Sequence, residues 1–302
     1  MVSLSPRRVV SAVRRRRATT EVVVPAPEQT PEQRRRERRR ERRRRLRTMS
    51  LTELAEEFGT DKWGVHHYTP HYERHLEHLR RREFTLLEIG VGGYTRRKRS
   101  GASLKMWRWF FPRARIVGLD IEDKSFIDQG PIVTYQGDQT DPEVFHRIFA
   151  EQGVPMVVVD DGSHVPAHVR ATFGIVFPLL PDGAIYCIED TQTSYWPAWG
   201  GQLDPRARGT SMDMVKDLVD GLNHEELLVE GYEPTYTDTH VRAVHCYHNL
   251  VVIEKGDNRE GTNKDTSSGH FHGSSPDPAL AAASNPAASP EASLEETAEE
   301  AP

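Results

Sequence analysis

Two acidic clusters in the middle of the chain combine residue types that can bind a hard cation and move a proton. Asp160, Asp161 and His164 follow one apolar run, and Glu189 and Asp190 end the next one. Carboxylates held close together repel each other unless a cation lies between them. Oxygen ligands with one imidazole and no cysteine select Mg²⁺, or Mn²⁺, over Zn²⁺. The alternative is a capping acid beside surface acids, but the position of both clusters directly after apolar runs favours a metal site.

A second group of residues suits a ligand that carries a nucleoside. Three further apolar runs end in glycine and polar residues, and glycine allows a ligand to approach the backbone closely. Asp120 could accept hydrogen bonds from ribose hydroxyls, and Asp138 with Gln139 could meet an adenine edge. A dinucleotide-binding loop would open directly into a helix, whereas a polar stretch at 94–101 intervenes here, which disfavours a dinucleotide oxidoreductase. The candidate ligand-binding residues are Glu88, Gly90, Gly92, Asp120, Asp138 and Gln139.

The elements that must position these residues alternate between strand and helix. Apolar runs predict strands at 84–90, 115–121, 132–138, 155–161, 184–190, 240–247 and 249–255. Helical patterns lie at 51–58 (with Thr52 as its cap), 72–81, 103–111, 142–153, 169–180 and 213–223. Near-continuous apolar strands separated by helices predict an α/β doubly wound, mostly parallel sheet with both faces covered. Ligands of such sheets bind beyond the carboxyl ends of the strands, so both groups of candidate residues should meet at one edge.

Charge divides the chain into three parts. Residues 1–50 hold 17 Arg and 5 Glu, whereas 51–256 and 257–302 are both net acidic. We expect an Arg-rich disordered extension at 1–50, a folded domain at 51–256, and a disordered Ser/Ala/Pro/Glu-rich tail at 257–302. The second Arg cluster, at 34–47, could become helical because Glu37 and Glu41 have Arg three or four residues away, but it has almost no apolar face. Alternatively, the native chain starts at Met49.

The composition also limits the partners and the compartment. An acidic domain disfavours nucleic acid, so only the Arg-rich arm could bind it. The two cysteines, Cys187 and Cys246, are too few for a disulfide framework and indicate a reducing cytoplasm. We expect no membrane span because no apolar run approaches 18 residues, and no secretory signal because the chain starts without an apolar stretch.

The motifs LLEIGVGG, GLDI, QGDQTDP, VVVDDGSH and YCIEDTQTSYW together resemble those of the class I S-adenosylmethionine-dependent methyltransferases. The resemblance covers 51–256 and is strongest to the Mg²⁺-dependent sugar O-methyltransferases of macrolide and related antibiotic pathways. The segment TDKWGVHHYTPHYERHL, at 60–76, is similar to the entry of that catalytic domain. The family would have a Rossmann-like fold, S-adenosylmethionine and Mg²⁺ as cofactors, and a small glycosylated acceptor. The implied roles are metal ligation by Asp161, Glu189 and Asp190, general-base catalysis by His164, and methyl-donor binding by the glycines and polar residues given above.

The chemistry of the residues agrees with this resemblance. A sugar hydroxyl is a poor nucleophile, and chelation of two neighbouring hydroxyls by Mg²⁺ would lower its pKa and fix its orientation. An imidazole such as His164 is well matched to remove that proton near neutral pH. The aromatic stretch at 193–199 could bind an acceptor ring, or could equally pack within its own loop. Two alternatives for the function stay open: a catechol-like or other diol acceptor, and a non-catalytic module tethered to nucleic acid by the Arg-rich arm. Assembly into a homo-oligomer is a separate possibility.

Overall fold

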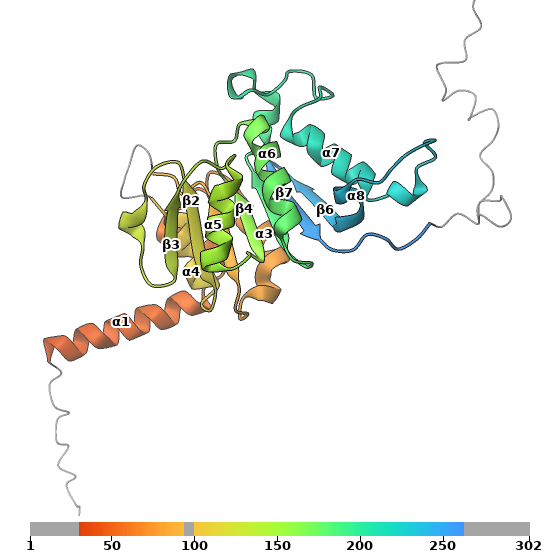
Figure 1. The fold of residues 1–302 in the computed structure, drawn as a ribbon. Coiled ribbons are helices and arrows are strands. Elements are labelled where there is room, and N and C mark those ends of the chain that lie inside the picture. The colour runs from red at the N-terminus through yellow and green to blue at the C-terminus, as the bar shows by residue number, and fades with distance from the viewer. Residues whose placement is uncertain (1–29, 94–99, 263–302) are drawn as a thin grey trace, which may run out of the picture. The chain divides into compact units, whose positions relative to one another are not determined.

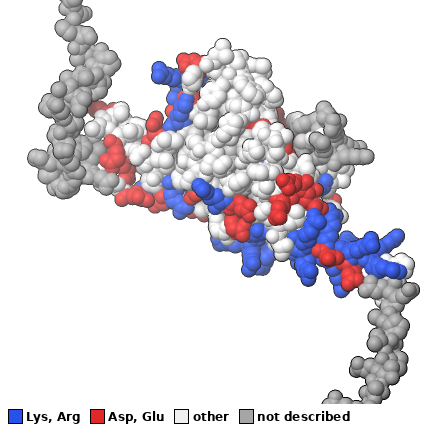
Figure 2. Space-filling model, turned by 180° about the vertical axis from the view of Figure 1, so that it is seen from behind, with Lys and Arg blue, Asp and Glu red and all other residues white. Residues whose placement is uncertain are grey.

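The computed structural model describes residues 30–93 and 100–262, and its chain divides into two units between Thr48 and Met49. In the first unit, α1 (Pro31–Thr48) is a helix whose surface is dominated by Arg side chains with Glu between them (Figure 2). The sequence analysis predicted a disordered extension here. The helix forms because Arg has high helix propensity and Glu32 pairs with Arg36 one turn away, at 2.8 Å. Residues 1–29 and most of the predicted tail, 263–302, lie outside the described residues.

The second unit is built on a seven-stranded sheet, ordered β3-β2-β1-β4-β5-β7-β6 (Figure 1). The strands from β1 to β5 run parallel, and β7 and β6 are antiparallel additions at one edge. The strand order reverses between β1 and β4, which is where doubly wound sheets bind their ligands. The strands are β1 (Thr85–Ile89), β2 (Arg115–Asp120), β3 (Ile132–Gln136), β4 (Val157–Asp160), β5 (Ile185–Glu189), β6 (Val241–Tyr247) and β7 (Leu250–Lys255).

Helices cover both faces of the sheet, as predicted for a doubly wound fold (Figure 1). One face packs against α5 (Pro142–Gln152), α6 (Pro166–Val176) and α7 (Ser211–Gly221) through a continuous apolar core. The other face carries α4 (Ala102–Phe110), with α2 (Leu51–Phe58) and α3 (Thr69–Leu76) beside it. The segments that connect these strands and helices contain short helical elements: η1 (Glu77–Leu79), η3 (Ser125–Ile127), η4 (Phe177–Leu179), η5 (Thr191–Tyr195), η6 (Pro197–Trp199), η7 (His224–Glu226) and α8 (Tyr236–His240).

Alternation along each strand decides which face a side chain reaches. In β1, Leu87 and Ile89 join the core beneath α5 and α6, so Glu88 points to the opposite face, toward α3 and α4. In β5, Tyr186 and Ile188 belong to the same core, so Glu189 also points to the α3 side. Two carboxylates from separate strands are therefore directed into one interior region.

One helix cap differs from its prediction. The cap of α2 is Ser50 rather than Thr52: its hydroxyl accepts from the Glu53 amide, and the Glu53 carboxylate accepts from the Ser50 amide. Glutamate three residues after serine completes this capping box, which Thr52 could not do from inside the helix. Among the described residues, no helix is both long enough and apolar enough to cross a membrane.

Candidate active site

A cavity of about 270 Å³ opens at the carboxyl ends of β1 to β4, beside the point where the strand order reverses. Four of the predicted ligand-binding residues, Gly90, Asp120, Asp138 and Gln139, line it. Gly92 is not among the described lining residues. The remaining lining residues are Ile89, Leu119, Ile121, Gly137, Gly162, Ser163 and His168. His168 was not predicted, because it lies inside a helical pattern rather than at the end of a strand.

Glu88, which the sequence assigned to the same ligand, does not line this cavity. Its side chain is fully buried on the opposite face of β1, with Oε1 3.2 Å from the Lys62 ammonium. Burial raises the pKa of Glu88 to about 7, although Lys62 lowers it. The alternation of side chains along β1 therefore removes Glu88 from the ligand cavity and places it in an interior charge cluster.

Asp120 and Gln139 are held in place by the backbone around the cavity. The Asp120 carboxylate accepts hydrogen bonds from the amides of Val91 and Glu122, both at 2.9 Å. The Gln139 side chain accepts from the Ser163 amide at 2.7 Å and donates to the Thr172 hydroxyl. The carboxylate also lies 3.9 Å from the Lys124 ammonium, and it borders the cavity. The Gln139 amide is committed to the protein, and its main effect is to fix the cavity wall.

Gly90 is required by the packing of two strand ends. Its φ is 87°, in the region that favours glycine, and an added Cβ would lie 1.9 Å from the carbonyl oxygen of Asp161. The glycine thus allows the ends of β1 and β4 to meet, and this contact sets the position of Asp161.

Asp161, His164 and Asp190 converge next to the cavity. One potential ligand atom from each lies within 4.8 Å of the others. His164 Nε2 is 3.7 Å from Asp190 Oδ2 and 4.0 Å from Asp161 Oδ1. His164 and Asp190 also have positive φ values, 56° and 54°, which are uncommon for non-glycine residues. The structure therefore brings together two predicted metal ligands and the predicted base.

Glu189, the third predicted ligand, is held by two residues that the sequence analysis did not identify. Lys62 is fully buried, and its ammonium lies 2.7 Å from both Glu189 Oε1 and Asp161 Oδ2. Tyr72 donates to the same Glu189 oxygen at 2.5 Å, and Tyr68 donates to Asp190 at 2.7 Å. All three come from the segment 60–76, which resembles the entry of the catalytic domain and in which a helix is predicted from Tyr72, but no pattern there indicates a contact with β5.

The charge of this cluster fits a divalent cation. Burial by itself lowers the pKa of Lys62, but the nearby carboxylates Asp161, Glu189 and Glu88 outweigh burial and raise it, so the ammonium stays charged. Burial also raises the pKa of Asp161 and of Glu189, although Lys62 lowers both, so one ammonium only partly stabilises the ionised carboxylates. The oxygen-rich donor set of Asp161 and Asp190 suits Mg²⁺, which would balance the remaining negative charge.

Exposed aromatic rings follow β5, and one of them lies beside His164. Tyr195, Trp196 and Trp199, in η5 and η6 and between them, are 38–48% exposed. The Trp199 ring is 6.0 Å from the His164 ring, centroid to centroid. Packing within the loop therefore does not bury these rings, which favours the interpretation that this stretch binds an acceptor ring.

This fold, with a cavity over β1–β3 and an acidic cluster at β4–β5, is that of the class I S-adenosylmethionine-dependent methyltransferases. Mycinamicin VI 2''-O-methyltransferase of Micromonospora griseorubida is 46% identical over 218 residues, 71% of this chain and 55% of the relative. Demethylmacrocin O-methyltransferase of Streptomyces fradiae is 48% identical over 214 residues, which are 70% of this chain and 54% of the relative. Over about 70% of its own length, the chain is therefore similar to macrolide sugar O-methyltransferases. The chain spans just over half the length of these relatives.

A solved structure agrees with the sequence relatives. The mycinamicin-pathway methyltransferase MycE, in complex with Mg and SAH, has a TM-score of 0.70 and 43% identity over 78% of this chain and 60% of its own. A second MycE structure, in complex with Mg, SAH and mycinamycin VI, has the same TM-score and identity over 80% of this chain. Comparison with protein-family models gave no match.

Proposed function

We propose that the chain is an S-adenosylmethionine- and Mg²⁺-dependent O-methyltransferase that acts on a sugar hydroxyl of a small natural product. The observation that carries this proposal is the convergence of Asp161, His164 and Asp190 beside the cavity over β1–β3. A methyl donor in the cavity would present its sulfonium to an acceptor held at the acidic cluster. The activity is assigned to the segment 51–256, which the motifs cover.

The methyl donor is assigned to the cavity. Asp120 would accept from the ribose hydroxyls, because its carboxylate is fixed by two backbone amides and borders the cavity. Asp138 is exposed just after β3 and would contact the adenine of the donor. Gln139 shapes the wall of the cavity beside it. Gly90 and Gly92 would allow the donor to approach the backbone after β1.

The metal is assigned to Asp161, Glu189 and Asp190. Asp161 and Asp190 offer oxygens beside His164, while Glu189 has one oxygen committed to Lys62 and Tyr72 and a second that can ligate. When bound, Mg²⁺ would supply Lewis-acid activation and orientation of the acceptor hydroxyl. Tyr68 and Tyr72 hold Asp190 and Glu189 in position through hydrogen bonds.

His164 is assigned as the general base. The imidazole would take the hydroxyl proton of the acceptor, whose oxygen then bonds to the methyl carbon. The carbon–sulfur electron pair stays on sulfur, and S-adenosylhomocysteine leaves. Asp190 and Asp161, at 3.7 and 4.0 Å, would stabilise the imidazolium that forms. The exposed rings of Trp196 and Trp199 would bind the sugar or its apolar aglycone.

A product assay tests this assignment. The full chain is incubated with S-adenosylmethionine, Mg²⁺ and a panel of glycosylated macrolides, with catechols as a second panel, and products are identified by mass. We expect one added methyl group on a glycosylated acceptor. Methylation of catechols alone would instead support the diol alternative, and no product in either panel would contradict the proposal.

The compartment and the partners of the enzyme are also proposals. Cys187 is buried, Cys246 is exposed, and both are free thiols, which is consistent with the reducing cytoplasm expected from the sequence. Binding of nucleic acid by the Arg-rich arm and assembly into a homo-oligomer stay predictions.

A further inference from the structure

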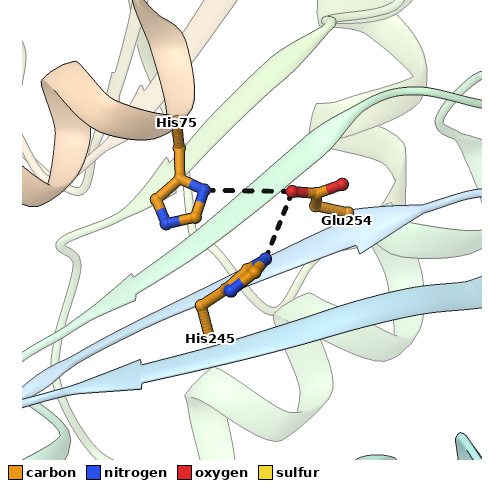
Figure 3. A group of neighbouring side chains, drawn as sticks. All are labelled: His75, His245 and Glu254. Carbon is orange, nitrogen blue, oxygen red and sulfur yellow. Dashed lines mark hydrogen bonds and ion pairs between the residues drawn. The ribbon is translucent and has the colours of Figure 1, made fainter.

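A second group of potential ligands lies away from the proposed catalytic site. His75 of α3, His245 of β6 and Glu254 of β7 point toward one another across the antiparallel edge of the sheet (Figure 3). Glu254 pairs with Ile185, the first residue of β5, whereas the catalytic cluster lies at the last. Four residues of strand separate these positions, which is about 13 Å. The two groups are therefore independent sites.

The three side chains present a donor set that is typical of transition-metal sites. One ligand atom of each lies within 4.8 Å of the others. Glu254 Oε1 is 3.2 Å from His245 Nε2 and 3.8 Å from His75 Nδ1. The second distance is too long for a hydrogen bond, so both imidazoles aim at one oxygen that only His245 reaches. A cation between the three atoms would bind to all of them.

Neighbouring residues orient these ligands. The other ring nitrogen of His75, Nε2, lies 2.8 Å from the Tyr247 hydroxyl, and the other oxygen of Glu254 accepts from Arg242 at 2.8 Å. Such outer partners fix the ring orientation of metal-binding histidines and the direction of metal-binding carboxylates. If His75 donates from Nε2 to Tyr247, its Nδ1 carries the lone pair that faces Glu254 and His245.

The protonation states also suit a metal. Burial lowers the pKa of His75, with His245 and Arg74 acting in the same direction. Burial raises the pKa of Glu254, but hydrogen bonds from Arg242 and His245 outweigh it and hold the pKa below its usual value. A neutral imidazole and an ionised carboxylate are the forms that ligate metals.

We propose that His75, His245 and Glu254 bind a divalent transition metal of the Zn²⁺ type. Two imidazoles with one carboxylate are a common protein ligand set for zinc, whereas Mg²⁺ prefers oxygen ligands alone. The ion would tie α3 to the β6–β7 hairpin. Because Tyr72, three residues before His75 on the same helix, donates to Glu189, the site would also stabilise the position of a proposed catalytic-site residue through α3.

Zinc titration of the full chain tests the site. Excess Mg²⁺ is present throughout to occupy the acidic cluster, and binding is followed by calorimetry and by the Zn²⁺-induced shift in melting temperature. His245→Ala is the principal variant because His245 is partly exposed, so its loss leaves little cavity. His248→Ala is the matched control: this exposed histidine lies in the turn of the same hairpin. The chain has 14 histidines, and binding to the others is equal in both variants.

We expect His245→Ala to bind the tightest Zn²⁺ equivalent at least about tenfold more weakly than the wild type, and to lose its stabilisation by Zn²⁺. His248→Ala should behave as the wild type, and Glu254→Gln should reproduce the loss. Asp161→Asn should retain the site, which separates this proposal from the catalytic one. Equal Zn²⁺ affinity and equal stabilisation in His245→Ala and His248→Ala would overturn the proposal.

Discussion

Lys62 offers a quantitative test of how the acidic cluster is held. Lys62→Met keeps most of the side-chain volume but removes the ammonium that lies 2.7 Å from Asp161 and from Glu189. Hydrogen bonds to charged groups contribute about 1.5–3 kcal/mol each, so losing two costs about 3–6 kcal/mol. Variants of other proteins that lose one partner of a buried ion pair are destabilised by about 3–5 kcal/mol. Both routes predict that metal-free Lys62→Met loses about 3–5 kcal/mol of unfolding free energy.

The measurement is equilibrium unfolding in urea, near neutral pH and with a chelator present. Lys216→Met, a change at an exposed lysine of α7, is the control and should lie within about 0.5 kcal/mol of the wild type. The double variant Lys62→Met/Glu189→Gln should be more stable than Lys62→Met alone, because one uncompensated buried carboxylate is also removed. A loss below about 1 kcal/mol in Lys62→Met, or no recovery in the double variant, would refute this account of the cluster.

Three further predictions concern the donor, the pH dependence and the N-terminal arm. Asp120→Ala should weaken donor binding by about 1.5–3 kcal/mol in a calorimetric titration, and unchanged affinity would contradict the ribose assignment. Burial raises the pKa of Glu88 to about 7 from 4.5, so the folded state holds a proton between these values that the unfolded state has released. The melting temperature of metal-free protein should therefore rise as the pH falls from about 8 to about 5, and Glu88→Gln should flatten this profile. Deleting residues 1–48 should change the melting temperature and donor affinity little, because Leu46 is the only buried side chain among the described residues of that segment; a large fall in melting temperature would show a structural role.

The sheet and most helices were predictable because the signals are local. The helix predicted at 51–58 coincides with α2, and the apolar strand runs are bounded by glycine, proline and acidic residues that end the elements. Asp161, His164 and Asp190 could be placed together for the same reason, since parallel strands bring their carboxyl ends to one edge.

The interior partners of these residues were not predictable from local patterns. Lys62 lies 99 residues from Asp161 and 127 from Glu189 along the chain. Its segment has no periodicity that indicates burial, and a lysine is expected at the surface. The position of Glu88 outside the cavity also has a three-dimensional reason, because the alternation of side chains along the strand directs it to the face where Lys62 lies.

The most direct test of the proposed catalytic role is a comparison of His164→Ala with His146→Ala, an exposed histidine of α5, in single-turnover methyl transfer. The acceptor is a glycosylated substrate that the wild type methylates, and calorimetry follows donor and Mg²⁺ binding in parallel. We predict that His164→Ala binds donor and Mg²⁺ as the wild type does but transfers methyl about 10²–10⁴-fold more slowly. A chelator should abolish transfer by the wild type, and added Mg²⁺ should restore it. Normal turnover by His164→Ala, or activity that survives chelation, would contradict the account.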